Sequence, residues 1–192
     1  MSHNESGTIG IIVLVALALV PVLWFIITYN TLVRTRQQTR ESWSGIDTEL
    51  KRRYDLIPNL VETVRGYAKH ERETLQQVIE ARNKAVASTG SPGSQAVDEN
   101  ILVGMLKQLL AVAENYPQLK ANENFLKLQE ELANTEDRIQ AARRFYNANV
   151  RDLNTRIEVF PSNIVANMFN FTKGEFFEVE AAEVRRPVAV KI

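Results

Sequence analysis

From Ile9 to Thr28 the sequence reads IGIIVLVALALVPVLWFIIT, without a single charged residue. An α-helix rises about 1.5 Å per residue, so this stretch would extend about 30 Å, which is the hydrocarbon thickness of a bilayer. A secretory signal peptide would carry a basic residue before a shorter apolar run and a small-residue cleavage site after it. Neither feature is present. The sequence therefore predicts a transmembrane helix over 9–28, which Pro21 kinks without ending.

The charges that flank this segment predict its orientation. Residues 1–8 contain no lysine or arginine, whereas Arg34, Arg36 and Arg40 follow the apolar run. Positively charged flanks stay in the cytoplasm, so we expect a short extracytoplasmic tail at 1–8 and a cytoplasmic domain after the span. Trp24 and Tyr29 lie toward the end of the span, where amphipathic rings favour the membrane interface.

The overall composition excludes several classes of function. A chain of 192 residues accommodates one domain and an anchor. Lysine plus arginine equals aspartate plus glutamate at 23 each, so no global positive field favours nucleic acid. The chain has no cysteine, which excludes a disulfide scaffold, a thiolate nucleophile and a cysteine-ligated metal. We expect no nucleic-acid partner and no cofactor.

Beyond the anchor, apolar residues recur every three or four positions, which predicts long amphipathic helices. We expect the membrane helix to continue without a loop, and the helices of the domain to span these ranges: 29–54, 58–87, 97–114 and 122–159. Pro58 disfavours helix at Ile57 and Asp55 is a plausible cap, so a break or kink is expected there. The segment 88–96 is predicted to be a loop because it is rich in serine, glycine and proline.

The last of these helices carries the longest apolar stripe. Its members are Phe125, Leu128, Leu132, Ile139, Ala142, Tyr146, Val150, Leu153, Ile157 and Phe160. Several helices with one apolar stripe each predict an all-α fold, an antiparallel bundle that continues from the membrane helix. Near the membrane, Arg36 and Thr39 occupy stripe positions, which indicates a stalk exposed to solvent or to neighbouring copies.

The segment 162–192 is predicted to be a short helix followed by an extended tail. Ser162 is expected to cap a turn or helix that runs through Phe169. The tail is aromatic or β-branched in two places, Phe176-Phe177-Glu178-Val179 and Pro187-Val188-Ala189-Val190. We expect it to dock on the bundle or on a neighbouring subunit.

Several blocks of sequence resemble the LemA family of bacterial membrane proteins. The most distinctive is the run from Leu50 to Val64, LKRRYDLIPNLVETV. Similar blocks occur in the same order at Tyr29-Asn30-Thr31-Leu32-Val33, Trp43-Ser44-Gly45-Ile46-Asp47, Tyr67-Ala68-Lys69-His70-Glu71, Tyr116-Pro117-Gln118-Leu119-Lys120-Ala121, Leu128-Gln129-Glu130-Glu131-Leu132, Thr135-Glu136-Asp137-Arg138-Ile139 and Phe176-Phe177-Glu178. Two small departures are Phe169-Asn170-Phe171, where members often read Phe-Gly-Phe, and Gln118, where an aspartate is usual.

The resemblance implies a single-pass anchor in the cytoplasmic (inner) membrane of a bacterium and an antiparallel helical bundle in the cytoplasm. It implies no established enzymatic activity. In some bacteria the family's genes neighbour that of a membrane zinc protease, which suggests another membrane protein as a partner.

No catalytic or metal-binding pattern is apparent. Only His3 and His70 could perform acid–base chemistry near neutral pH, and no second histidine follows His70 at the spacing of a zinc-protease motif. Acidic pairs such as Glu130-Glu131 lie among lysines and arginines on a face expected to be solvated, whereas an acid–base pair needs one carboxyl removed from water. We therefore expect a protein that is not an enzyme.

One charged cluster surrounds the predicted break at Pro58. Its members are Lys51, Arg52, Arg53, Asp55, Asn59 and Glu62, with Glu136 and Arg143 as possible facing partners on the last helix. Arg53 follows Leu50 by three residues, so it is expected to be partly buried and to need a carboxylate from Asp55, Glu62 or Glu136. We interpret the cluster as a structural ion-pair network. The alternatives are a docking site for a partner and a contact with anionic lipid.

These observations favour a membrane-anchored structural or scaffolding protein that forms homo-oligomers, binds partners, and organises the membrane or regulates a membrane complex. The alternative is a membrane-tethered sensor or adaptor that binds a ligand or peptide, with the membrane zinc protease as a candidate partner.

Overall fold

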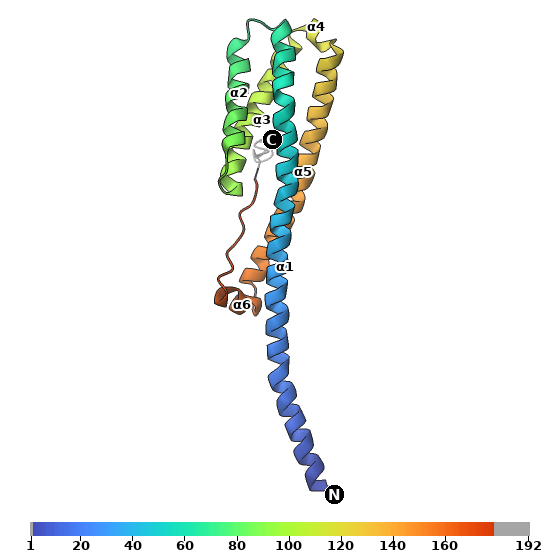
Figure 1. Cartoon of the computed structure of the whole chain (residues 1–192), viewed down its shortest axis with the longest axis vertical. Helices are drawn as coiled ribbons and strands as arrows, with labels where there is room; N and C mark the ends of the chain where they lie inside the picture. Colours follow the sequence, from blue (N-terminus) through green and yellow to red (C-terminus); the bar gives the residue numbers. More distant parts are fainter. Residues whose placement is uncertain (1, 179–192) are drawn as a thin grey trace, which may run out of the picture. The chain divides into compact units, whose positions relative to one another are not determined.

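The computed structural model describes residues 2–178, and these are α-helical with an extended C-terminal segment. The helices are α1 (Ser2–Tyr67), α2 (Arg72–Ala87), α3 (Pro92–Glu114), α4 (Pro117–Lys120), α5 (Glu123–Glu158) and α6 (Ser162–Met168). The all-α prediction is confirmed (Figure 1). Of the described residues, 2–42 with 148–174 form one compact unit, and 43–147 with 175–178 form another. Helices α1 and α5 contribute residues to both units.

Most of the described side chains in the apolar start of α1 are exposed. They include the large apolar side chains of Leu17, Val20, Leu23 and Ile27. Among the described residues this helix, near the N-terminus, is the one that is long and apolar enough to cross a membrane. It continues without a loop through Pro21, as predicted, because the apolar residues on both sides maintain the helix.

In the second unit, α1, α2, α3 and α5 lie side by side and successive helices run in alternating directions (Figure 1). Their apolar stripes converge on one core, which includes Ile57, Val64, Leu75, Leu102 and Leu109. Asn122 caps α5, because its side-chain oxygen accepts a hydrogen bond of 3.0 Å from the Phe125 amide. The predicted antiparallel bundle is therefore this unit.

The predicted break at Asp55–Pro58 is wrong, because α1 continues to Tyr67 and the turn before α2 lies at 68–71. A proline inside a helix leaves the carbonyl four residues earlier, that of Tyr54, without its usual donor. Nε of Arg82 on α2 donates to that carbonyl at 3.1 Å. A tertiary contact thus compensates for the backbone hydrogen bond that Pro58 cannot make.

The predicted loop at 88–96 is too long, since α3 begins at Pro92 rather than at Val97. Ser91 is the N-cap residue: its side chain accepts from the Ser94 amide. Proline is favoured at the first helical position because its missing N–H would have no intrahelical acceptor there. Serine and proline, which suggested a loop, here start a helix.

The first unit has its own small core. It consists of Leu32, Leu153, Ile157, Val165, Ala166 and Phe171. Thr39, predicted to lie on an exposed stalk, is buried, as are Thr35 and Ser42. The stalk prediction is wrong at these three residues. Each hydroxyl donates to a carbonyl three or four residues earlier in α1, so burying these side chains leaves no hydroxyl donor unsatisfied.

The end of α5 departs from its predicted stripe at Phe160, which is 75% exposed. The helix ends at Glu158, so Phe160 no longer follows the helical repeat. Ser162 does not cap α6 but donates to the carbonyls of Arg156 and Val159, at 2.7 and 2.9 Å. The tail is extended up to Glu178, and its predicted segment 187–190 lies outside the described residues.

Candidate functional site

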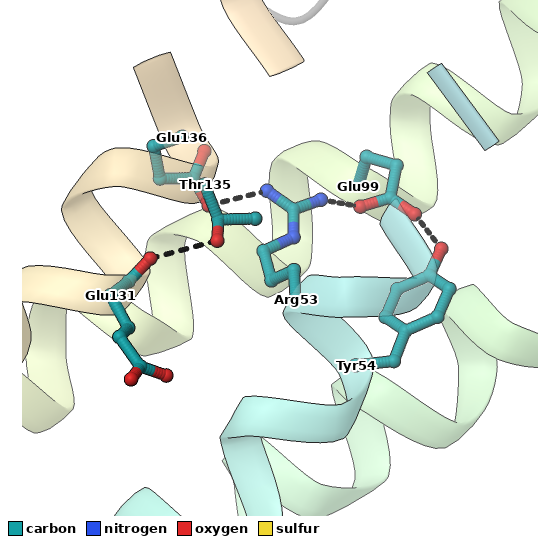
Figure 2. Close-up of polar contacts among 6 residues, drawn as sticks. All are labelled: Arg53, Tyr54, Glu99, Glu131, Thr135 and Glu136. Carbon is teal, nitrogen blue, oxygen red and sulfur yellow. Dashed lines mark hydrogen bonds and ion pairs between the residues drawn. The ribbon is translucent and has the colours of Figure 1, made fainter. Parts of the chain in front are cut away.

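A buried arginine lies at the centre of the second unit. Arg53 on α1 is 1% exposed, and its guanidinium lies between carboxylates from two other helices (Figure 2). One terminal nitrogen donates to Oε1 of Glu136 on α5 at 2.8 Å, and the other donates to Oε2 of Glu99 on α3. A single side chain therefore joins three helices of the bundle.

Glu99 is the most deeply buried acid of this network, at 2% exposure. Its second oxygen accepts a hydrogen bond from the hydroxyl of Tyr54, the residue after Arg53 (Figure 2). Burial raises the pKa of Tyr54 above 10.0, and the positive charge of Arg53 partly opposes that shift. The phenol therefore stays protonated and keeps donating to Glu99 at any physiological pH.

This arrangement fits an ion-pair network better than a catalytic site. Two carboxylates face one guanidinium, and the Glu136 carboxylate is partly exposed and therefore solvated. Thr135, beside it, is buried and donates to the Glu131 carbonyl at 2.8 Å. In the part of the chain that the structure describes, no group of three or more histidine or acidic side chains could hold a metal ion.

Most of the predicted cluster does not converge on Arg53. Lys51 pairs with Asp47 at 3.0 Å, and Glu62 pairs with Arg65 at 2.6 Å, both on the surface of α1. The structure places four further members of the predicted set as follows: Arg52, Asp55 and Asn59 are exposed, and Arg143 is half-buried. A role for any of them in partner or lipid binding stays a prediction.

The remaining candidates lie apart from this network. Trp24 and Tyr29 belong to the first unit, where Trp24 is exposed and Tyr29 is half-buried. His70 is exposed in the turn between α1 and α2, and the His3 side chain lies outside the described side chains. None of these is part of a catalytic arrangement in the described residues.

Residues 175–178 occupy a groove of the second unit, which we call the tail groove. Phe177 is completely buried, and its ring contacts Trp43 of α1 at 5.3 Å between centroids. Trp43 in turn contacts Tyr146 of α5 at 5.2 Å. The rings meet edge to face, the arrangement that aromatic quadrupoles favour.

The bundle binds the tail mostly through hydrogen bonds to the backbone of the tail. Asn147 of α5 accepts from the Phe177 amide at 3.0 Å and donates to the Phe177 carbonyl at 3.1 Å. The Tyr146 hydroxyl donates to the Glu175 carbonyl at 2.8 Å, and the Gly93 amide of α3 donates to the Glu175 carboxylate at 3.3 Å. The tail groove therefore holds an extended segment of this chain through its backbone and one large aromatic side chain.

Alkaline pH is expected to release the tail through Tyr146. Burial, reinforced by the charge of Glu175, raises the pKa of Tyr146 from 10.0 to about 12. Docking thus favours the neutral phenol. The resulting contribution to the free energy of docking is complete below pH 10 and is lost as pH rises toward about 12. Trp43 fluorescence and tyrosinate absorbance should show this step in the wild type, and Tyr146→Phe should remove it. A profile that the substitution leaves unchanged would contradict the assignment.

A long apolar helix joined to a helical bundle with a buried ion-pair network defines a membrane-associated, all-helical protein. The LemA family model matches residues 42–192. The chain belongs to the LemA family, as the sequence blocks predicted.

Its relatives carry two names. The chain is 26% identical to Magnetosome protein MamQ 2 of Paramagnetospirillum magneticum, over 88% of this chain and 73% of that protein. It is 27% identical to Protein LemA of Metamycoplasma hominis, over 82% and 71% of the two chains. A third relative is Magnetosome protein MamQ of Magnetospirillum gryphiswaldense, 23% identical over 94% and 77%. None of these names describes an enzyme.

Proposed function

We propose that this protein is a membrane-anchored scaffold whose copies assemble by exchanging tails. The tail groove carries the proposal. The groove binds residues 175–178 through the Trp43 side chain of α1, the Gly93 amide of α3 and the Tyr146 and Asn147 side chains of α5, with no covalent link other than the chain itself. The tail of a neighbouring copy could make the same contacts, and exchange of an identical element is a low-cost route to oligomers.

Membrane attachment favours this exchange. Copies confined to one bilayer meet at a high effective concentration, so weak individual contacts produce strong association. We propose the cytoplasmic membrane as that bilayer, with the N-terminus outside and the bundle in the cytoplasm. Arg34 and Arg40, exposed on α1 after the apolar span, support this orientation. The scaffold would organise the membrane or hold a membrane complex in place.

Cysteine cross-linking of the full chain in nanodiscs tests the exchange, because the native chain has no cysteine. A Cβ at Gly93 would lie 2.8 Å from the Glu175 carboxylate, so Gly93→Cys and Glu175→Cys put one thiol on each side of this contact. One copy carries Gly93→Cys and the other carries Glu175→Cys, with tags of different mass. Mild oxidation is expected to yield the mixed disulfide dimer.

The double variant Gly93→Cys/Glu175→Cys, at one copy per nanodisc, is the geometric control and should form a disulfide within the chain. Glu123→Cys, at an exposed position of α5, replaces Gly93→Cys as the negative control and should yield no mixed dimer with Glu175→Cys. If the double variant cross-links and mixed samples remain monomeric, tail exchange is wrong.

The main-chain contacts of the tail groove also favour a second candidate, an adaptor that captures a peptide of another membrane protein. Asn147 hydrogen-bonds only to backbone atoms of the tail, so any extended segment with an aromatic side chain at the position of Phe177 would fit. The membrane zinc protease that the family resemblance suggests is the first partner to test. Inhibition of its binding by a synthetic peptide of residues 173–178 would favour this candidate.

A further inference from the structure

The corner between α5 and α6 carries no charge. The sequence from Val159 to Thr172, VFPSNIVANMFNFT, contains no lysine, arginine, aspartate or glutamate. Outside the apolar span, the uncharged run at 85–97 is similar in length, but it consists mainly of small and polar residues. The run at 159–172 lies entirely within the first unit of the structure.

This corner exposes large apolar side chains as a group. Phe160 is 75% exposed, Met168 61%, Val159 52%, Ile164 50% and Phe169 44%. We call these five residues the corner patch. Soluble proteins scatter single exposed apolar residues, but a contiguous group marks a surface that contacts protein or membrane.

The core of the unit does not need these side chains. The inner face of α6, Val165 and Ala166, is fully buried against Leu32 and its neighbours, and Phe171 closes the same core. Ser162 fixes the turn through its hydrogen bonds to the carbonyls of Arg156 in α5 and of Val159 just after it. The corner is therefore held by these contacts while Phe160, Met168, Val159 and Ile164 remain largely exposed.

The corner patch adjoins the end of the apolar span. The Phe169 ring lies 5.9 Å from that of Phe25, which is inside the span 9–28, and 4.6 Å from that of Tyr29, which follows it. Because these ring contacts fix the corner beside the last turn of the span, it lies at the depth where the hydrocarbon ends and the headgroups begin.

We propose that the corner patch is a second membrane contact, inserted into the interfacial layer of the leaflet in which the span ends. The occupant is lipid rather than protein because Phe169 of the patch contacts Phe25 and Tyr29 at the end of the apolar span, where the neighbouring Ile26 and Ile27 side chains are exposed. Its aromatic and aliphatic side chains carry no charge, so they can enter the boundary between headgroups and acyl chains without burying a charged group.

Two contacts have a mechanical consequence. A single span leaves a protein free to tilt and to rotate about the helix axis, whereas a second contact beside it fixes both. The first unit would then hold a defined face toward the bilayer. This inference rests on the membrane anchoring in the proposed function, but it is independent of tail exchange.

Spin labelling of the full chain in nanodiscs of zwitterionic and anionic phospholipid tests the contact. Met168→Cys and Ile164→Cys, each labelled with a nitroxide, report the corner patch. Leu23→Cys reports the span, and Gln129→Cys, an exposed position of α5 among charged residues, reports water. Relaxation by oxygen, which concentrates in lipid, is compared with relaxation by a water-soluble nickel chelate.

We expect labels at Met168 and Ile164 to favour oxygen over nickel, between the values for Leu23 and Gln129. If both corner labels match Gln129 while Leu23 remains in lipid, the corner contact is wrong and the anchor stands. If Leu23 is also accessible to nickel, the anchoring in the proposed function fails as well. Corner labels shielded from both reagents would mean that protein covers the patch, which also overturns the proposal.

Discussion

Replacing Arg53 with methionine is expected to lower the free energy of unfolding by about 3–5 kcal/mol, the usual cost of removing one member of a buried ion pair. Methionine matches the length of the side chain, so loss of packing is small. The cost arises because the Glu99 carboxylate stays buried without a cation. Chemical denaturation of the full chain in detergent, followed by far-ultraviolet circular dichroism, measures the change.

Arg52→Met is the matched control, since Arg52 is the preceding residue and is exposed. It should change the free energy of unfolding by less than about 0.5 kcal/mol. Glu99→Leu should cost less than Arg53→Met, because Glu136 remains 2.8 Å from the guanidinium. The double variant Arg53→Met/Glu99→Leu should recover most of the loss, since no buried charge is then left alone. Strict additivity of the two single effects would show that the pair is not coupled.

The sequence predicted that Arg53 would be at least partly buried and proposed one of its two partners, Glu136, but missed the other, Glu99. Arg53 follows Leu50 at helical spacing, and Glu136 lies on the stripe side of the long helix. Glu99 was missed because the third helix was expected to begin at Val97, so that its stripe began at Ile101. Extending the spacing backward from Leu109 through Leu106 and Leu102 reaches Glu99, and this signal could have found it.

Predictions from local sequence were wrong where a residue distant in the sequence stabilises the local structure. A proline usually ends or kinks a helix, but α1 continues through Pro58 because Arg82 binds the carbonyl that the proline leaves free. No sequence pattern near Pro58 predicts that Arg82 would bind this carbonyl. The docking of the tail was predicted, but the groove was not, because an extended segment has no periodicity to show which of its side chains is buried.

Replacing Phe177 with alanine is expected to weaken docking of the tail by about 3–5 kcal/mol, the typical loss for truncating a buried phenylalanine. The docked fraction should fall because the ring is completely buried against Trp43, and alanine leaves that space empty. Hydrogen exchange of the Phe177 amide, which donates to Asn147 in the docked state, measures the loss. Exchange at that position should accelerate more than a hundredfold.

Phe176→Ala is the matched control, because its side chain is the same, it is adjacent, and it is only half-buried. It should accelerate exchange far less than Phe177→Ala. The bundle core is built from other residues, so its unfolding transition should persist in both variants while Trp43 fluorescence changes only in Phe177→Ala. The same substitution in the Glu175→Cys copy should abolish the mixed disulfide dimer, since docking within and between chains would use one groove. A Phe177→Ala chain that keeps both its protected amide and its dimer would show that the aromatic contact does not hold the tail.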